Sequence, residues 1–130
     1  MESCRNKPDL DSKYKKSIHE FLAHSEGFEK FLQARFLGQK RFSIEGLESL
    51  IPMLQVIADE AAGQSGEEIC IGMAHRGRLN VLTNFMGKSS EKMLKEFEQS
   101  EFNTFDIDGD VKYHLGYCLL YTSPSPRDRG

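Results

Sequence analysis

The 130-residue sequence predicts an α/β fold that is mostly helical, with at least one parallel-sheet strand near residues 68–73. Apolar residues recur at three- and four-residue spacing in several segments, which is typical of amphipathic helices. Residues 67–73 form a short apolar run rich in β-forming residues, which is typical of a buried strand. A parallel sheet needs several strands, so we expect this sequence to hold only part of such a domain.

The first helix is expected from about Ser17 to Leu37, after a polar leader at residues 1–16. The leader is charged, contains Pro8 and shows no apolar period. The helix carries an apolar stripe for the core, and Gly27 is the point at which it could be interrupted. The stripe consists of Ile18, Phe21, Leu22, Phe28, Phe31, Leu32 and Phe36.

A second helix is expected between about Leu47 and Gly63, where the helical spacing of apolar residues resumes. Pro52 falls in its first turns, where proline is tolerated because those backbone N–H groups have no partner inside the helix. The predicted strand follows the glycines at 63 and 66, since glycine there marks a turn.

A third helix is expected to carry an apolar face from Leu79 to Met86 and to end at Gly87 as its C-cap. Ser89 or Ser90 can then cap a further helix. The apolar face of that last helix would consist of Met93, Leu94 and Phe97.

Charge and cysteine usage exclude several classes of function. The 17 basic and 20 acidic residues give a formal net charge of −3, so no positive field attracts nucleic acid. Cys4, Cys70 and Cys118 form no C-x-x-C pair, which argues against a zinc site or a disulfide framework. No apolar run approaches the roughly 20 residues that span a bilayer, and the N-terminus lacks a signal-peptide core. We expect an intracellular protein with no nucleic-acid or membrane partner.

The composition changes abruptly from Cys118 to Asp128, and serine and proline alternate over residues 123–126. This segment resembles the translated read-through of a sequencing adapter. Residues 118–130 are therefore expected to be a non-native tail, with Tyr117 as the last native residue, and they are excluded from reasoning about the fold.

The run Gly72–Asn80 lies between the predicted strand and the third helix, and it carries His75, Arg76 and Arg78. The start of a helix presents backbone N–H groups and a positive dipole end. Cations are unfavourable there unless an anion binds, and the planar guanidinium fork suits phosphate or carboxylate. Gly77 leaves room for a close backbone approach. The run therefore predicts an anion receptor.

Of the four histidines, His19 and His24 lie in the polar part of a helix and are assigned no function. His114 lies in the glycine-bounded segment Gly109–Gly116. A single loop histidine is more often structural than catalytic, but His75 stands beside the two arginines and is a candidate for contact with an anionic substrate, because imidazole can carry a positive charge near neutral pH.

Three segments, Gly38–Gly46, Gly72–Leu82 and Gly109–Gly116, resemble in order and spacing the decarboxylating first component of 2-oxoglutarate dehydrogenase complexes. The match covers roughly Phe28 to Tyr117. Three long motifs in the correct order make the resemblance specific. It implies that residues 17–117 are an incomplete first catalytic region, part of a thiamine diphosphate-binding domain.

The resemblance also implies an enzyme of the tricarboxylic acid cycle, with thiamine diphosphate and Mg²⁺ as cofactors. Such an enzyme, a homodimer at full length, decarboxylates 2-oxoglutarate oxidatively and passes the succinyl group to a lipoyl-bearing dihydrolipoyl succinyltransferase. Arg76 would contact the cofactor, while His75 and His114 would line the substrate pocket as catalytic residues. The separate roles of the two histidines stay open. The compartment would be the cytoplasm in a bacterium and the mitochondrial matrix in a eukaryote.

The sequence departs from the family in lacking the downstream motifs that supply the magnesium ligands and the cofactor-activating glutamate. The 130-residue polypeptide is therefore expected to be inactive, and the metal ligands are expected to lie outside it. Two alternatives stay open. One is a sibling enzyme, either a 2-oxoadipate dehydrogenase component or a 2-oxoglutarate decarboxylase. The other is a non-catalytic anion-binding interaction module.

Overall fold

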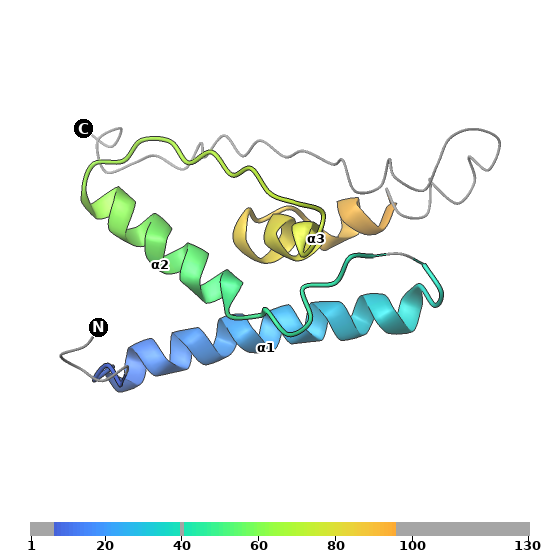
Figure 1. The fold of residues 1–130 in the computed structure, drawn as a ribbon, viewed down its shortest axis with the longest axis horizontal. Coiled ribbons are helices and arrows are strands. Elements are labelled where there is room, and N and C mark those ends of the chain that lie inside the picture. The colour runs from blue at the N-terminus through green and yellow to red at the C-terminus, as the bar shows by residue number, and fades with distance from the viewer. Residues whose placement is uncertain (1–6, 40, 96–130) are drawn as a thin grey trace.

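The computed structural model describes residues 7–39 and 41–95. Within these ranges the helices are α1 (Ser12–Arg35), α2 (Leu50–Gly63), α3 (Arg78–Asn80) and η2 (Val81–Phe85). A further helical segment covers residues 90–95. Figure 1 shows α2 rising at an angle from the long α1, with α3 beside both. The predicted mostly helical character is confirmed.

The first helix begins earlier than predicted. Asp11 caps α1, since its side chain accepts a hydrogen bond from the backbone N–H of Tyr14 at 2.6 Å. α1 therefore starts at Ser12, inside the stretch expected to be a leader. It also passes through Gly27 without a break, because packing along a helix this long outweighs the roughly 1 kcal/mol that an interior glycine costs.

The second helix starts three residues later than the position predicted near Leu47. The chain first makes tight turns, with the N–H of Leu47 bonded to the carbonyl of Ile44 at 2.7 Å. α2 then begins at Leu50, so Pro52 lies in its first turn and is buried there. The predicted tolerance of this proline is confirmed, because the missing N–H would have had no helical partner.

The strand predicted at residues 68–73 is not formed in the described ranges, which corrects the sequence interpretation. Residues 67–74 are irregular, and 51% of Ile69 is exposed. A strand exists only by pairing with a neighbour, and no other strand is present in the described part of the chain. β-forming composition alone therefore did not produce a ladder. Cys70, in the same segment, is an exposed free thiol.

The third helical region is confirmed but has a wider geometry than predicted. α3 continues directly into η2, a π-helix in which the N–H of Met86 bonds to the carbonyl of Val81 at 2.9 Å. Gly87 follows with φ +70°, the left-handed conformation of a C-cap glycine. The next helical segment starts where the serine cap was predicted, and the carbonyl of Ser89 accepts from the N–H of Met93 at 3.1 Å.

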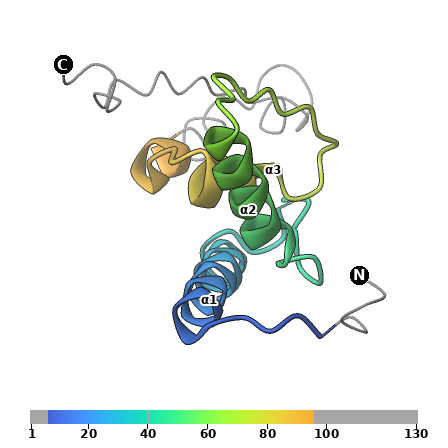
Figure 2. The same cartoon turned by 90° about the vertical axis from the view of Figure 1, so that its left-hand side faces the viewer.

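Two groups of buried side chains hold these helices together. Leu32, Phe36, Leu79, Leu82 and Met93 form one, and Ile44, Ile51 and Val81 form the other. Both groups include residues of α3 or η2, so this short helical region packs against α1 as well as α2. Figure 2 shows the three elements grouped in this way. No helix in the described residues is long and apolar enough to cross a membrane.

Candidate functional site

Gly77 forms a tight turn at the start of α3. It has φ +77°, and its N–H donates to the carbonyl of Phe42 at 2.8 Å. A Cβ atom built at this position would lie 2.9 Å from Cγ1 of Ile44, closer than real side chains approach. The backbone at Gly77 therefore packs closely against the 41–46 loop, and the approach of an anion predicted from the sequence is not tested by this contact.

Arg76 presents an exposed guanidinium beside this turn. One of its terminal nitrogens donates to the backbone carbonyl of Glu45 at 3.1 Å. Because a guanidinium carries five N–H donors, this bond orients the side chain and leaves capacity for an anion. Of the residues predicted to bind an anion, Arg76 fits that role best.

Arg78 differs from Arg76 in its exposure and in its hydrogen-bond partner. Its guanidinium is partly buried and donates to the carbonyl of Met73 at 2.8 Å, within the irregular segment that precedes the turn. This bond ties the start of α3 to that segment. The sequence predicted an anion receptor with two arginines. Of these two, only Arg76 is exposed, so the structure reduces the candidate anion-binding arginines to one.

His75 lies against the same loop as Arg76. Its ring centroid is 5.5 Å from that of Phe42, with the ring planes inclined by 31°. Phe42 itself has φ +42°, which is uncommon for a residue with a side chain. The structure therefore brings His75 and Arg76 together on the 41–46 loop. His114, the other predicted catalytic residue, lies outside the described residues.

A buried polar network lies beneath this loop and the start of α3. Asn80 is fully buried, and its side-chain nitrogen donates to the carbonyl of Ser25 at 3.0 Å and to Oε1 of Glu29 at 3.1 Å. Its side-chain oxygen accepts from the hydroxyl of Ser25 at 2.9 Å and from Nδ2 of Asn84 at 2.7 Å. Within the described residues, no buried side-chain nitrogen or oxygen lacks a hydrogen-bond partner.

Glu29 links this network to the loop. Only 6% of Glu29 is exposed, and its Oε1 also accepts from the N–H of Ile44 at 3.3 Å. Nη1 of Arg41 donates to the backbone carbonyl of Glu29 at 2.6 Å and lies 3.7 Å from Oε2. Sequence reasoning missed these residues. The signal was available, since Ser25 and Glu29 stand at helical spacing from Leu32 on one face of α1.

A carboxylate also stabilises the outer end of the loop. Oε1 of Glu48 accepts from the N–H of Gly46 at 2.9 Å. This bond, and then a bond from the N–H of Glu48 itself, lower the pKa of Glu48 below its ordinary value. The ionised carboxylate therefore stabilises the folded turn at neutral pH.

Glu48→Gln is expected to give a small loss of stability at neutral pH that disappears on acidification. Because the pKa is lower in the folded state, the contribution of Glu48 is complete above the ordinary pKa and is lost as pH falls through the lowered value. Thermal unfolding of the two proteins from neutral to acidic pH measures this. A difference that persists at the acidic end would contradict the assignment.

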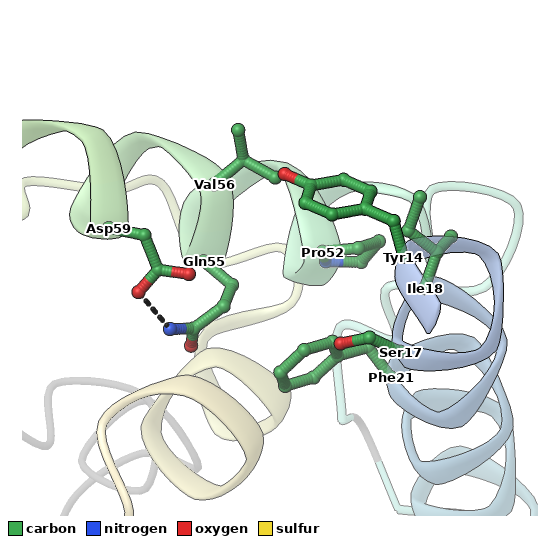
Figure 3. Close-up of a pocket in the computed structure, with 8 residues that line it drawn as sticks. All are labelled: Tyr14, Ser17, Ile18, Phe21, Pro52, Gln55, Val56 and Asp59. Carbon is green, nitrogen blue, oxygen red and sulfur yellow. Dashed lines mark hydrogen bonds between the residues drawn. The ribbon is translucent and has the colours of Figure 1, made fainter. Parts of the chain in front are cut away.

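The pocket between α1 and α2 is separate from this site. Figure 3 shows it lined by Tyr14, Ser17, Ile18, Phe21, Pro52, Gln55, Val56 and Asp59, with Gln55 bonded to Asp59. Its volume of about 40 Å³ is far below the roughly 300 Å³ of the smallest typical ligand pockets. None of the residues predicted to bind a ligand lines it, so we assign it no function.

Comparison with known proteins relates this chain to dehydrogenases of a 2-oxo acid. The chain is 52% identical over 118 residues to the 2-oxoglutarate dehydrogenase E1/E2 component of Corynebacterium glutamicum, covering 89% of this chain and 9% of that protein. It is 44% identical over 117 residues to the 2-oxoglutarate dehydrogenase E1 component of Cupriavidus necator, covering 90% and 12%. The Staphylococcus epidermidis E1 component is 47% identical over 121 residues, covering 85% and 13%.

The chain is thus homologous to a segment of 2-oxoglutarate dehydrogenase E1 components, and the resemblance found in the sequence is confirmed. It spans only about a tenth of the length of these relatives, between 9% and 13%. No family model and no solved structure matches it.

One described residue has the chemistry that a diphosphate group requires. The exposed guanidinium of Arg76 has the charge and the planar set of donors that suit a diphosphate group. The Gly77 turn adds no donor, because its N–H is bonded to Phe42 and Ile44 fills the space beside it. In residues 7–39 and 41–95, no group of three or more histidine, cysteine, aspartate or glutamate side chains is placed to hold a metal ion.

Proposed function

We propose that this chain forms part of a 2-oxoglutarate dehydrogenase E1 component, a thiamine diphosphate enzyme that decarboxylates 2-oxoglutarate oxidatively. The succinyl group would pass to a lipoyl-bearing dihydrolipoyl succinyltransferase, and the full-length protein would act as a homodimer. The observation that carries the proposal is the exposed Arg76 beside the Gly77 turn, within a chain homologous to enzymes of that name.

The described residues would bind and orient the reactants. Arg76 would hold the diphosphate of the cofactor through charge-assisted hydrogen bonds. His75 would line the pocket of the 2-oxo acid together with His114, and its contact with Phe42 would fix its ring. Thiamine diphosphate, when bound, supplies the chemistry that stabilises negative charge at the substrate carbon as carbon dioxide leaves. The Mg²⁺ ligands would come from elsewhere in the full-length protein.

The domain organisation belongs to the same proposal. Residues 17–117 would be part of the first catalytic, diphosphate-binding region of an α/β enzyme, and α1 extends this helical region back to Ser12. Residues 118–130 would be a non-native tail, which is supported by their abrupt change in composition. Genomic sequencing across Gly116 tests the second statement, because a native tail would appear in the genome.

The full-length protein that contains these residues is expected to release carbon dioxide from 2-oxoglutarate only when thiamine diphosphate and Mg²⁺ are present. The 130-residue polypeptide is expected to show no turnover, because the magnesium-binding motif is absent from its sequence. Oxidative decarboxylation measured with the lipoyl partner, and kcat/KM for 2-oxoglutarate against 2-oxoadipate, check both statements.

Each alternative gives a different result in this assay. A preference for 2-oxoadipate would indicate a sibling dehydrogenase, and succinic semialdehyde as the product would indicate a decarboxylase. Absence of turnover in the full-length protein would favour an anion-binding interaction module. Turnover by the 130-residue polypeptide would show that the missing motif is not required.

A further inference from the structure

The carboxylate of Glu29 contacts both segments of the candidate site, the 41–46 loop and α3. Its Oε1 accepts from the backbone N–H of Ile44 in the loop and from Nδ2 of Asn80 in α3. Two backbone carbonyls of the loop bond directly to site residues. The carbonyl of Glu45 accepts a hydrogen bond from the Arg76 guanidinium, and the carbonyl of Phe42 accepts one from the N–H of Gly77.

We propose that Glu29 is a positioning residue that holds the 41–46 loop against the start of α3 and so orients Arg76 toward the diphosphate of the cofactor. This inference rests on the proposed function. Glu29 does not contact Arg76 in any bond described above, so its effect passes through the loop.

The charge and burial of Glu29 favour this role over a purely local one. Burying a carboxylate costs free energy unless it is paired and hydrogen-bonded. The Glu29 carboxylate pairs with the guanidinium of Arg41 and accepts hydrogen bonds from the N–H of Ile44 and the side-chain amide of Asn80. These partners come from two segments distant in sequence, the 41–46 loop and α3. Removing its charge should therefore loosen the connection between the two segments.

A neighbouring glutamate provides a matched control. Glu26 lies on the same helix, less than one turn away, and pairs only with the exposed Lys30 at 2.6 Å in the contacts described here. Exposed pairs of this kind contribute little to stability. Glu26→Gln thus removes a charge and an ion pair from α1 without touching the loop.

The test compares Glu29→Gln with Glu26→Gln in the full-length protein, with and without Arg76→Ala. We expect Glu29→Gln to raise the dissociation constant for thiamine diphosphate, measured with Mg²⁺ present, roughly fivefold to tenfold. Glu26→Gln should leave it unchanged. In the Arg76→Ala background, Glu29→Gln should cause no further weakening, because the residue through which it acts is gone. A purely structural role would instead weaken binding equally in both backgrounds.

Hydrogen exchange in the cofactor-free protein gives a readout that does not depend on binding. Glu29→Gln should speed exchange of the Gly77 amide, which bonds to Phe42 in the loop, while Glu26→Gln should not. If Glu29→Gln fails to fold, Arg41→Gln weakens the same connection from the loop side, and the same pattern is expected.

The outcomes separate this inference from the proposed function. If Arg76→Ala weakens cofactor binding but neither Glu29→Gln nor Arg41→Gln does, the positioning role is refuted and the function stands. An effect of Glu29→Gln that adds fully to that of Arg76→Ala also refutes it. If Arg76→Ala leaves binding unchanged, the cofactor role of Arg76 fails, and the positioning role fails with it.

Discussion

Replacing Arg76 with alanine in the full-length protein is expected to weaken thiamine diphosphate binding by roughly tenfold to a hundredfold, the equivalent of about 1.5–3 kcal/mol for charged hydrogen bonds. The fold should be retained, because the guanidinium is exposed and its contact described here is one bond to the carbonyl of Glu45. Titration of cofactor into the Mg²⁺-containing protein, with circular dichroism as a check of folding, measures both effects.

Two further variants make this prediction specific. Arg76→Lys keeps the charge but loses the planar fork, so it should recover only part of the affinity. Arg78→Ala removes the bond to the carbonyl of Met73, and its first effect should be on the stability of the turn. If Arg78→Ala weakened binding as much as Arg76→Ala without loosening the turn, the division of roles between the two arginines would be wrong.

Gly77→Ala is expected to destabilise the start of α3 by roughly 2–4 kcal/mol, combining the left-handed backbone with overpacking. The added methyl group would lie 2.9 Å from Cγ1 of Ile44, which is itself only 1% exposed and has little room to move. Faster hydrogen exchange across residues 75–81 in the full-length protein measures this loss. Cofactor binding should fall as well, because the turn carries Arg76.

Gly87→Ala is the matched control, since Gly87 ends the same helical region with φ +70° and nothing lies within 4 Å of its added Cβ. Gly87→Ala should lower the free energy of unfolding only by the cost of the left-handed backbone, about 1–2 kcal/mol. Ile44→Ala should partly rescue Gly77→Ala by removing the atoms that clash. Equal losses for the two glycines, with no rescue, would show that the contact with Ile44 is unimportant.

Periodicity in the sequence predicted most of the helices, because helix formation depends on local spacing of apolar residues. Its errors came from effects that are not local. The predicted strand at residues 68–73 needed a pairing partner that the described residues do not provide. Phe31 was placed in the core stripe but is 49% exposed, because the buried face of α1 is turned toward Ser25 and Glu29.

The candidate site was predictable in part for the same reason. Arg76, His75 and Gly77 are adjacent in sequence, so their chemistry could be inferred together and the structure places them together. The supporting residues could not be inferred in this way. Ser25 and Asn80 are 55 positions apart, and only the packing of α3 on α1 brings them into contact.

The four hydrogen bonds of Asn80 limit what evolution or design can place at that position. Both amide protons and both acceptor sites of the oxygen are occupied, which also settles which end of the amide is nitrogen. Aspartate has the same shape but could not donate to the carbonyl of Ser25 and would set a second carboxylate against Glu29. Leucine would remove all four of these hydrogen bonds. Asparagine is the side chain of this size that can form all four hydrogen bonds. Position 80 should therefore tolerate substitution least, although Asn80 need not contact any reactant.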